Sequence, residues 1–341
     1  MKQFSAGAMR LTIDDARLAS ANDLVRRTLA QHGLAPGGSI SASMPNLSPR
    51  KSPAAPAALI APGASFEQAR FTCAAGSRSY MTYVPASAKD GASGLLMMLH
   101  GCTQTALDFA TGTGMNALAD QHGFVVVYPE QSRGDNAQSC WNWFSRGDQQ
   151  RGRGEPAILA GLAAQTARKY GVTPETTFVA GLSAGAAMAV ILGETYNDVF
   201  TAVGAHSGLP YGAATDVPSA FAAMSGNAKD RRVSAKHAPR TIVFHGTADH
   251  TVNLTNAVTI AGDIVRAGPA QTLSESRTGR ENGRTFTCEI TATVEGRLLM
   301  EHWTIDGLGH AWSGGGPDGS YTDATGPHAS AEMVRFFLRH G

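Results

Sequence analysis

The chain has 341 residues, of which 43 % are hydrophobic, so it is long enough to bury a sizeable core. Its 28 Lys and Arg nearly balance its 27 Asp and Glu, and the net charge of +1 argues against a strongly basic surface for nucleic acid. No stretch approaches the roughly 18 consecutive apolar residues of a membrane-spanning helix, so we expect no transmembrane segment.

Residues 1–62 differ in composition from the rest of the chain. They carry a net charge of +4, whereas the remaining residues carry −3. Thr12 is a suitable N-cap for a helix, and four apolar residues fall near one face of that helix: Leu11, Leu18, Val25 and Leu29. A Pro- and Ser-rich stretch continues to Pro62. We therefore predict an N-terminal helix and linker over 1–62, which docks on its own domain or serves localisation, and one larger domain over 63–341.

The first residues do not resemble a secretory leader. Lys2 is followed by a mixed segment with Asp14, Asp15 and Arg17, and not by an apolar stretch of about 7–15 residues. This pattern predicts a cytoplasmic protein, or one that is exported without such a leader.

From about residue 71, patterns typical of strands alternate with patterns typical of helices. Short apolar runs predict strands at Tyr80–Val84, Leu95–Leu99, Phe124–Tyr128, Thr177–Ala180, near Val203–His206, at Thr241–Phe244 and at Leu298–Ile305. Helical composition covers Pro156–Tyr170 and Ala184–Leu192. Such alternation predicts an α/β fold, with a mainly parallel central sheet and helices on both faces.

The motif Gly181-Leu182-Ser183-Ala184-Gly185 lies between a predicted strand and a predicted helix. It matches G-x-S-x-G, in which two glycines let a strand and a helix approach closely around a strained turn that exposes the serine hydroxyl. The helix N-terminus behind the serine favours developing negative charge. Ser183 is therefore the candidate nucleophile.

A serine nucleophile needs a base, and the base needs a carboxylate that orients it. Asp249 lies in the loop after the strand that ends at Phe244, and His310 follows the last strand in a loop freed by Gly307 and Gly309. The order Ser, Asp, His is the order of this class of hydrolase. The rival acids and bases are less well placed: Asp306, Asp318, Asp323, His206, His245, His302 and His328.

Acyl transfer also needs hydrogen-bond donors for the oxyanion. We expect one from the amide of Ala184, next to the nucleophile, and a second from the amide of Cys102 in the loop His100-Gly101-Cys102-Thr103-Gln104. A plain glycine turn is the alternative for that loop.

Aromatic residues follow the predicted strands at the ligand-binding edge of such a sheet. Trp143 lies in Cys140-Trp141-Asn142-Trp143-Phe144, and Trp312 follows His310 by two residues. Each is a candidate for the substrate wall or for the core. Four cysteines allow three complete pairings, and either free thiols or a bridge between Cys102 and Cys140 fits the pattern, whereas Cys73 and Cys288 have no clear partner.

Together these motifs resemble the short-chain polyhydroxyalkanoate depolymerase family, or PHB depolymerase-type esterases, with a type 1 catalytic domain. The matching segments are residues 99–104, Tyr128-Pro129-Glu130-Gln131, residues 140–144, residues 181–185, His206-Ser207-Gly208 and residues 307–315. The resemblance implies an α/β-hydrolase fold, a Ser183–His310–Asp249 triad with an oxyanion hole, and hydrolysis of 3-hydroxybutyrate polymer or oligomers. It implies no metal and no organic cofactor.

Three functions remain open at this point. The first is hydrolysis of hydroxyalkanoate esters, and the second is the same chemistry on feruloyl, acetylxylan or other short-chain esters. The third is a granule-associated binding protein, against which the complete triad argues. A polymer-granule surface is a candidate partner besides the ester, and no nucleic acid is expected. Related depolymerases are secreted, so an extracellular location is the alternative to the cytoplasm.

Overall fold

The computed structural model describes residues 60–227 and 239–339. The chain divides between residues 47 and 48, and every described residue belongs to the second unit. The helix and linker predicted for residues 1–62 lie almost entirely outside the described residues. At the start of the described part, Ile60 and Ala64 pack against the core. None of the described helices is long and apolar enough to cross a membrane.

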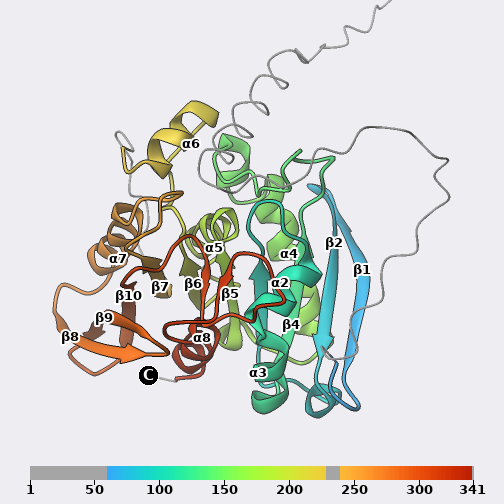
Figure 1. Ribbon diagram of the computed structural model, residues 1–341. Helices are drawn as coiled ribbons and strands as arrows, with labels where there is room; N and C mark the ends of the chain where they lie inside the picture. Colours follow the sequence, from blue (N-terminus) through green and yellow to red (C-terminus); the bar gives the residue numbers. More distant parts are fainter. Residues whose placement is uncertain (1–59, 228–238, 340–341) are drawn as a thin grey trace, which may run out of the picture. The chain divides into compact units, whose positions relative to one another are not determined.

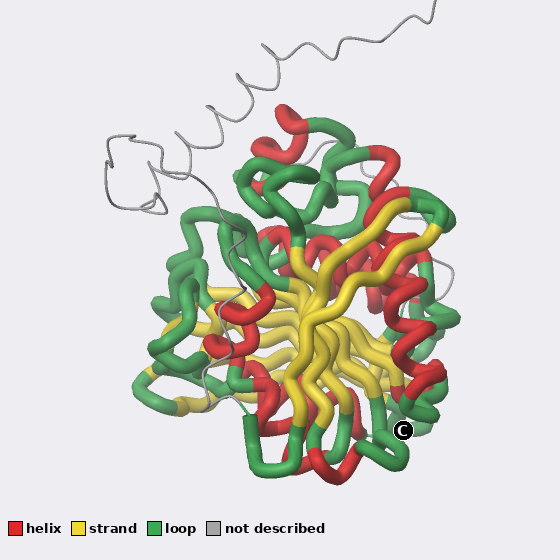
Figure 2. The backbone as a smooth tube through the Cα atoms, turned by 90° about the vertical axis from the view of Figure 1, so that its right-hand side faces the viewer, coloured by secondary structure: helices red, strands yellow, loops and turns green. Residues whose placement is uncertain are grey.

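A ten-stranded sheet forms the centre of the described part of the chain (Figures 1 and 2). Its strand order is β1 (Ser65–Cys73), β2 (Gly76–Val84), β4 (Val125–Glu130), β3 (Leu95–Leu99), β5 (Thr177–Leu182), β6 (Ala202–His206), β7 (Arg240–Gly246), β10 (Leu298–Ile305), β9 (Arg284–Thr293) and β8 (Thr272–Glu281). The strands from β4 to β10 in this order run parallel to one another.

The prediction of a mainly parallel sheet needs correction, because the sheet is mixed. At one end β1 and β2 add in antiparallel fashion, and at the other end β9 and β8 do the same. The hairpin of β8 and β9 turns at Asn282-Gly283, where both residues have positive φ, 42° and 87°. Asn-Gly is a strong signal for a two-residue hairpin turn, so the sequence carried a marker for these two strands that the search for apolar runs missed.

Helices cover both faces of the sheet, as the alternation predicted. On one face the core contains side chains of α4 (Gly154–Lys169), α5 (Ala184–Thr195), α6 (Val217–Met224) and α7 (Thr255–Ala267). On the other face it contains side chains of α2 (Ala106–Thr113), α3 (Met115–His122) and α8 (Ala329–Leu338). Short 3₁₀ turns complete the helical elements: η2 (Ala86–Ala88), η3 (Arg146–Gln149) and η4 (Pro174–Thr176).

The central strands are apolar on both sides because each side faces a layer of helices. In β3, Leu95, Met97 and Leu99 belong to one core, while Leu96 and Met98 belong to the other. Since parallel strands all end at the same edge, the loops after β3, β5, β7 and β10 meet there. These are the loops that carry the predicted site residues.

Candidate active site

Ser183 lies at a sharp turn between β5 and α5. Its backbone has φ 56° and ψ −119°, a conformation that costs free energy for a residue with a side chain. Its amide donates to the carbonyl of His206 at 2.9 Å, which holds the turn to the end of β6. Close packing enforces glycine on both sides: a Cβ on Gly181 would lie 2.4 Å from the carbonyl carbon of Gly185, and one on Gly185 would lie 2.1 Å from the carbonyl oxygen of Leu99.

The predicted oxyanion donors lie on two neighbouring segments. Ala184 is the first residue of α5, so its amide has no acceptor within the helix. The loop after β3 runs beside the serine turn. The backbone of Gly185 lies close against the backbone of Leu99, and a Cβ on Gly101 would lie 3.5 Å from the carbonyl oxygen of Leu182. Cys102 follows in that loop. The assignment of the Cys102 and Ala184 amides stays a prediction that this arrangement favours.

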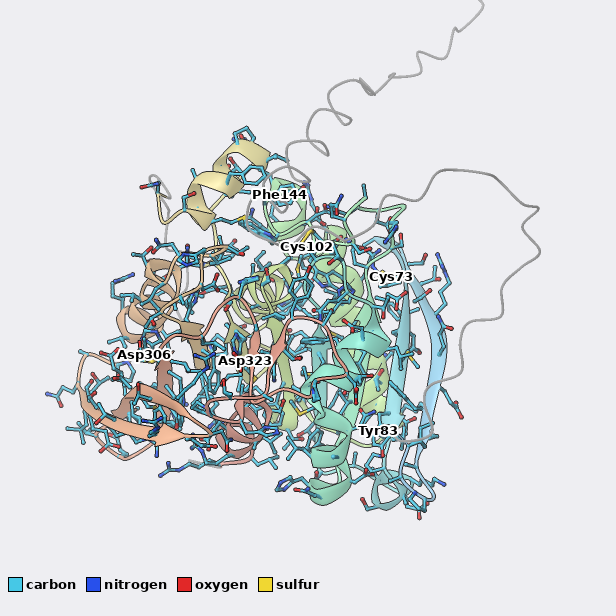
Figure 3. All side chains as sticks on the ribbon, in the orientation of Figure 1. Cys73, Tyr83, Cys102, Phe144, Asp306 and Asp323 are labelled. Atoms are coloured by element: carbon cyan, nitrogen blue, oxygen red, sulfur yellow. A yellow bond between two sulfur atoms is a disulfide. The ribbon has the colours of Figure 1, made fainter. Side chains whose placement is uncertain are left out.

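Cys102 and Cys140 form a disulfide, with 4.2 Å between their Cα atoms, so this alternative of the sequence analysis is confirmed (Figure 3). The bridge connects the loop after β3 with the aromatic loop after β4. Cys73 and Cys288 are free thiols.

Asp249 and His310 come together from the loops after β7 and β10. The Nδ1 of His310 lies 2.8 Å from Oδ2 of Asp249, and Oδ1 accepts the amides of Thr251 and Val252 at 2.9 Å each. Burial by itself would raise the pKa of Asp249, but the hydrogen bond and charge of His310 hold it below its ordinary value. The carboxylate is thus buried, ionised and directed at the imidazole, as an orienting acid must be.

His206 connects the serine turn to the loop that follows His310. Its carbonyl accepts the Ser183 amide, and its Nε2 accepts the amide of Ser313 at 3.1 Å. Burial lowers the pKa of His206 to about 3, so the ring is neutral and available as an acceptor. These contacts give His206 a structural role.

Most of the other rivals also have structural partners. His245 is buried, and its Nε2 donates to the carbonyl of Val252 at 2.8 Å while lying 3.4 Å from Oδ2 of Asp249. Asp318 is exposed. The remaining contacts are His302 with Glu289, His328 with the amide of Ala331, Asp306 with Thr247, and Asp323 with Arg284 (Asp306 and Asp323 are labelled in Figure 3).

The structure places Trp312 in the core, the second of the two roles that its position in the sequence left open. Its side chain is 1 % exposed, its indole N–H donates to Oγ of Ser330 at 3.0 Å, and its ring stacks on His206 at 5.1 Å. The pairing of β11 (Trp312–Ser313) with β12 (Thr322–Asp323) fixes it in the core. Trp143 is 6 % exposed and belongs to the other core, edge-on to the half-buried ring of Phe144.

Gln104 is a site residue to which the sequence analysis gave no role. Its Oε1 accepts the amide of Gly101 at 2.8 Å, and its Nε2 donates to the carboxylate of Asp108 and the carbonyl of Ser320, both at 3.0 Å. It ties the loop after β3 to the loop after His310. The sequence placed Gln104 in the loop after β3, but it could not show that the Gln104 side chain contacts Ser320, 216 residues further along the chain.

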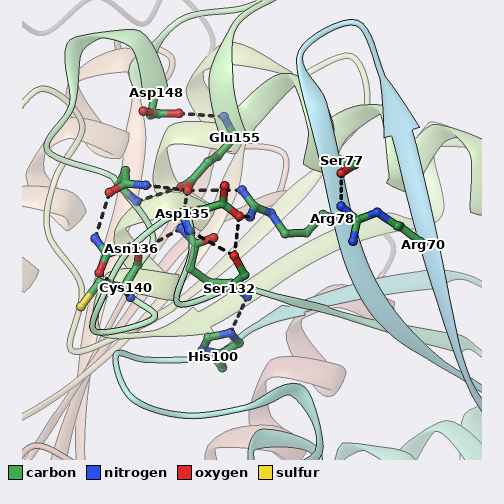
Figure 4. A network of polar contacts seen from close by, with 12 residues as sticks. Arg70, Ser77, Arg78, His100, Ser132, Asp135, Asn136, Cys140, Asp148 and Glu155 are labelled. Atoms are coloured by element: carbon green, nitrogen blue, oxygen red, sulfur yellow. Dashed lines mark hydrogen bonds and ion pairs between the residues drawn. The ribbon is translucent and has the colours of Figure 1, made fainter. Parts of the chain in front are cut away.

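A second missed feature is the buried carboxylate of Glu155, at the start of α4 (Figure 4). It accepts both the amide and the side-chain amide of Asn142 at 2.8 Å, the side-chain amide of Gln131, and Arg78 at 3.5 Å. Burial raises the pKa of Glu155 to about 7, while these donors favour its ionised form. The network fastens the loop that carries Cys140 to α4 and β2.

No group of three or more His, Cys, Asp or Glu suited to a metal ion occurs among residues 60–227 and 239–339. The roles of Ser183 as nucleophile and His310 as base stay predictions.

The sequence of this chain is similar to those of curated ester hydrolases. A poly(3-hydroxyalkanoate) depolymerase C of Paucimonas lemoignei is 35 % identical over 229 residues, which are 63 % of this chain and 54 % of the relative. A probable acetylxylan esterase A of Aspergillus clavatus is 29 % identical over 177 residues, 47 % of this chain and 56 % of the relative. The chain thus spans about half the length of these curated relatives.

The fold is shared with solved esterase structures. An acetyl xylan esterase from Aspergillus awamori superimposes with a TM-score of 0.59 over 80 % of this chain and 98 % of that one, at 20 % identity, which establishes the α/β-hydrolase fold. The family model described as Esterase PHB depolymerase matches residues 78–283, which include the serine turn, Asp249 and both bridged cysteines. The chain belongs to the PHB depolymerase-type esterase family.

Proposed function

We propose that this protein is a serine carboxylic-ester hydrolase that cleaves poly- or oligo(3-hydroxybutyrate) esters through an acyl-enzyme. The observation that carries the proposal is the 2.8 Å contact of His310 with Asp249, at the sheet edge where Ser183 forms a strained turn. Membership of the family and the depolymerase relative support the substrate class.

In this mechanism Ser183 Oγ attacks the ester carbonyl carbon and its proton passes to His310. The carbonyl oxygen becomes an oxyanion that accepts hydrogen bonds from the amides of Cys102 and Ala184. The C–O bond to the alcohol then breaks, and His310 returns the proton to the leaving oxygen. Water attacks the acyl-enzyme with His310 as base, and the acid is released as Ser183 regains its proton.

Removal of the nucleophile tests the proposal directly. Ser183→Ala is expected to abolish hydrolysis of a nitrophenyl butyrate ester with the circular dichroism spectrum unchanged, and His310→Ala is expected to be comparably severe because triad members act as a unit. His328→Ala serves as the matched control, since His328 caps α8. Wild-type turnover by Ser183→Ala, or an inactive His328→Ala beside an active His310→Ala, would contradict the assignment.

A second candidate substrate class is acetylated or feruloylated plant cell-wall polymer, which the acetylxylan esterase relative favours. The same machinery would hydrolyse these esters, so the difference lies in binding alone. Initial rates on amorphous hydroxybutyrate polymer, its soluble oligomers, acetylated xylan and methyl ferulate, measured side by side, decide between the two. Higher kcat/KM on acetylated xylan or methyl ferulate than on the oligomers would reject the first candidate.

A further inference from the structure

His245 is a fully buried imidazole to which the proposed reaction gives no part. It is the last residue but one of β7 and lies four residues before Asp249 in the chain. Its Nε2 lies 2.8 Å from the carbonyl oxygen of Val252 and 3.4 Å from Oδ2 of Asp249. Its Nδ1 has no hydrogen-bond partner among the residues that the structure describes. The polar contacts of this ring thus lie at one nitrogen.

The carbonyl of Val252 leaves one tautomer for His245. A carbonyl oxygen only accepts, so Nε2 carries the ring proton and Nδ1 carries none. Burial lowers the pKa of His245, and the charge of Asp249 offsets this effect only in part, so the ring is neutral near pH 7. His245 is therefore a neutral donor whose N–H points at the turn that carries Asp249.

This donor closes a ring of contacts around the acid. The amide of Val252 donates to Oδ1 of Asp249 at 2.9 Å, while the carbonyl of Val252 accepts from His245. Val252 is thus held at both of its main-chain groups, one by the acid and the other by His245. Because Oδ1 is engaged by the turn, Oδ2 is left for His310, which it contacts at 2.8 Å.

A neutral donor fixes the acid without using up its charge. A cationic side chain at this place would pair with the carboxylate and weaken its attraction for the protonated form of His310. At 3.4 Å the N–H of His245 is too far from Oδ2 for a strong hydrogen bond, so it does not compete with the 2.8 Å contact of His310.

The unpaired Nδ1 argues against a role in packing alone. A buried acceptor without a partner costs free energy of folding. An apolar side chain would fill the same space without that cost. The retained imidazole is explained by what its other nitrogen does, and that nitrogen faces Val252 and Asp249.

We propose that His245 is a positioning residue of the candidate triad, which holds the turn of Asp249 and Val252 in the orientation that brings Oδ2 to His310. This inference rests on the proposed function. The alternative is a core histidine that supports only the fold. The two differ in whether the contact of Asp249 with His310 depends on the donor at Nε2.

Three substitutions isolate that donor. In His245→Gln the side-chain amide can occupy the place of Nε2 and still donate to Val252. In His245→Asn the amide reaches only the place of Nδ1, and in His245→Met an apolar side chain fills the space without any donor. We expect kcat for nitrophenyl butyrate to fall about 10²-fold in His245→Asn and His245→Met, the effect of a displacement of about 1 Å, with KM little changed. His245→Gln should lose less than about tenfold.

A second readout reports the geometry of the acid directly. The proton between Nδ1 of His310 and Oδ2 of Asp249 gives a far-downfield ¹H NMR resonance while the two atoms stay in hydrogen-bond contact. We expect this resonance in wild type and His245→Gln, and its loss in His245→Asn and His245→Met. Its position depends on the folded molecules alone, so partial unfolding does not imitate the effect. Asp249→Asn, which removes the acceptor, is the control without the resonance.

Several outcomes would overturn the role of His245. One is an unchanged resonance or an unchanged kcat in a folded His245→Asn or His245→Met, and another is an equal loss in His245→Gln and His245→Asn. If both variants without the donor failed to fold while His245→Gln folded, His245 would support the fold alone, and the proposal would also fall.

Failure of the proposed function has a different signature. A wild type that hydrolysed no ester or lacked the downfield resonance, or an active Ser183→Ala, would overturn the esterase mechanism and with it the role of His245. An active wild type with the resonance, an inactive Ser183→Ala and a His245→Met like wild type in both readouts would overturn the inference about His245 alone.

Discussion

At the scale of single residues, the orientation of His310 depends on one carboxylate oxygen of Asp249. Asp249→Asn keeps the shape but offers an amide where Nδ1–H needs an acceptor, so the imidazole would settle in the wrong tautomer. We expect kcat to fall by up to about 10⁴-fold with an unchanged fold. Asp323→Asn is the matched control, because Asp323 pairs with Arg284. An active Asp249→Asn beside an inactive Asp323→Asn would move the acid elsewhere.

The buried neutral histidines also predict how stability depends on pH. Burial lowers the pKa of His100 to about 4 and that of His206 to about 3. Between these values and the ordinary pKa of about 6.5, the unfolded chain binds protons that the folded chain does not, so the free energy of unfolding falls as the pH falls. Each histidine contributes up to about 1.4 kcal/mol per pH unit to the slope of the free energy of unfolding against pH.

Urea unfolding of His100→Asn at several pH values checks this slope. The variant lacks one titrating group, so its free energy of unfolding should fall less steeply than that of wild type, by up to about 1.4 kcal/mol per unit from about pH 6 to about pH 4.5. Parallel curves for wild type and His100→Asn would contradict a lowered pKa of His100 in the folded protein.

At the scale of elements, the loops after β3 and β4 are joined by the disulfide of Cys102 and Cys140, 38 residues apart. Closing a loop of this length restricts the unfolded chain and stabilises the fold by up to about 4 kcal/mol. The double variant Cys102→Ser, Cys140→Ser should unfold at lower urea concentration by about that free energy, whereas Cys73→Ser, which removes a free thiol, should not. Equal midpoints for the double variant and wild type would contradict a stabilising bridge.

At the scale of the whole molecule, we expect residues 1–59 to be separable from hydrolysis of a soluble ester. The core and all proposed site residues lie in the described part, which begins with the packing of Ile60 and Ala64. A chain that starts at Ile60 should keep wild-type kcat/KM on nitrophenyl butyrate and its melting temperature. If the segment docks on polymer granules, activity on granules alone should fall. Loss of activity on both substrates with a lower melting temperature would show that the segment supports the fold.

By itself, the sequence determined the parts of this protein that depend on local pattern. The apolar runs located seven strands and the composition located α4 and α5, because burial on both faces and helical propensity act over a few neighbouring residues. The glycines around Ser183 and the order of Ser183, Asp249 and His310 could also be read from the sequence, since each of these three residues lies in the turn or loop that follows a predicted strand.

Only the tertiary structure decided which distant residues meet. The burial of Trp312 against Ser330, the bridge between Cys102 and Cys140, and the contact of His100 with Gln131 each join different elements or loops of the chain. As a sequence feature, a tryptophan two residues after His310 suits a pocket wall and a core equally well. The choice depends on whether another element covers it, and that is a property of packing between elements rather than of any local pattern.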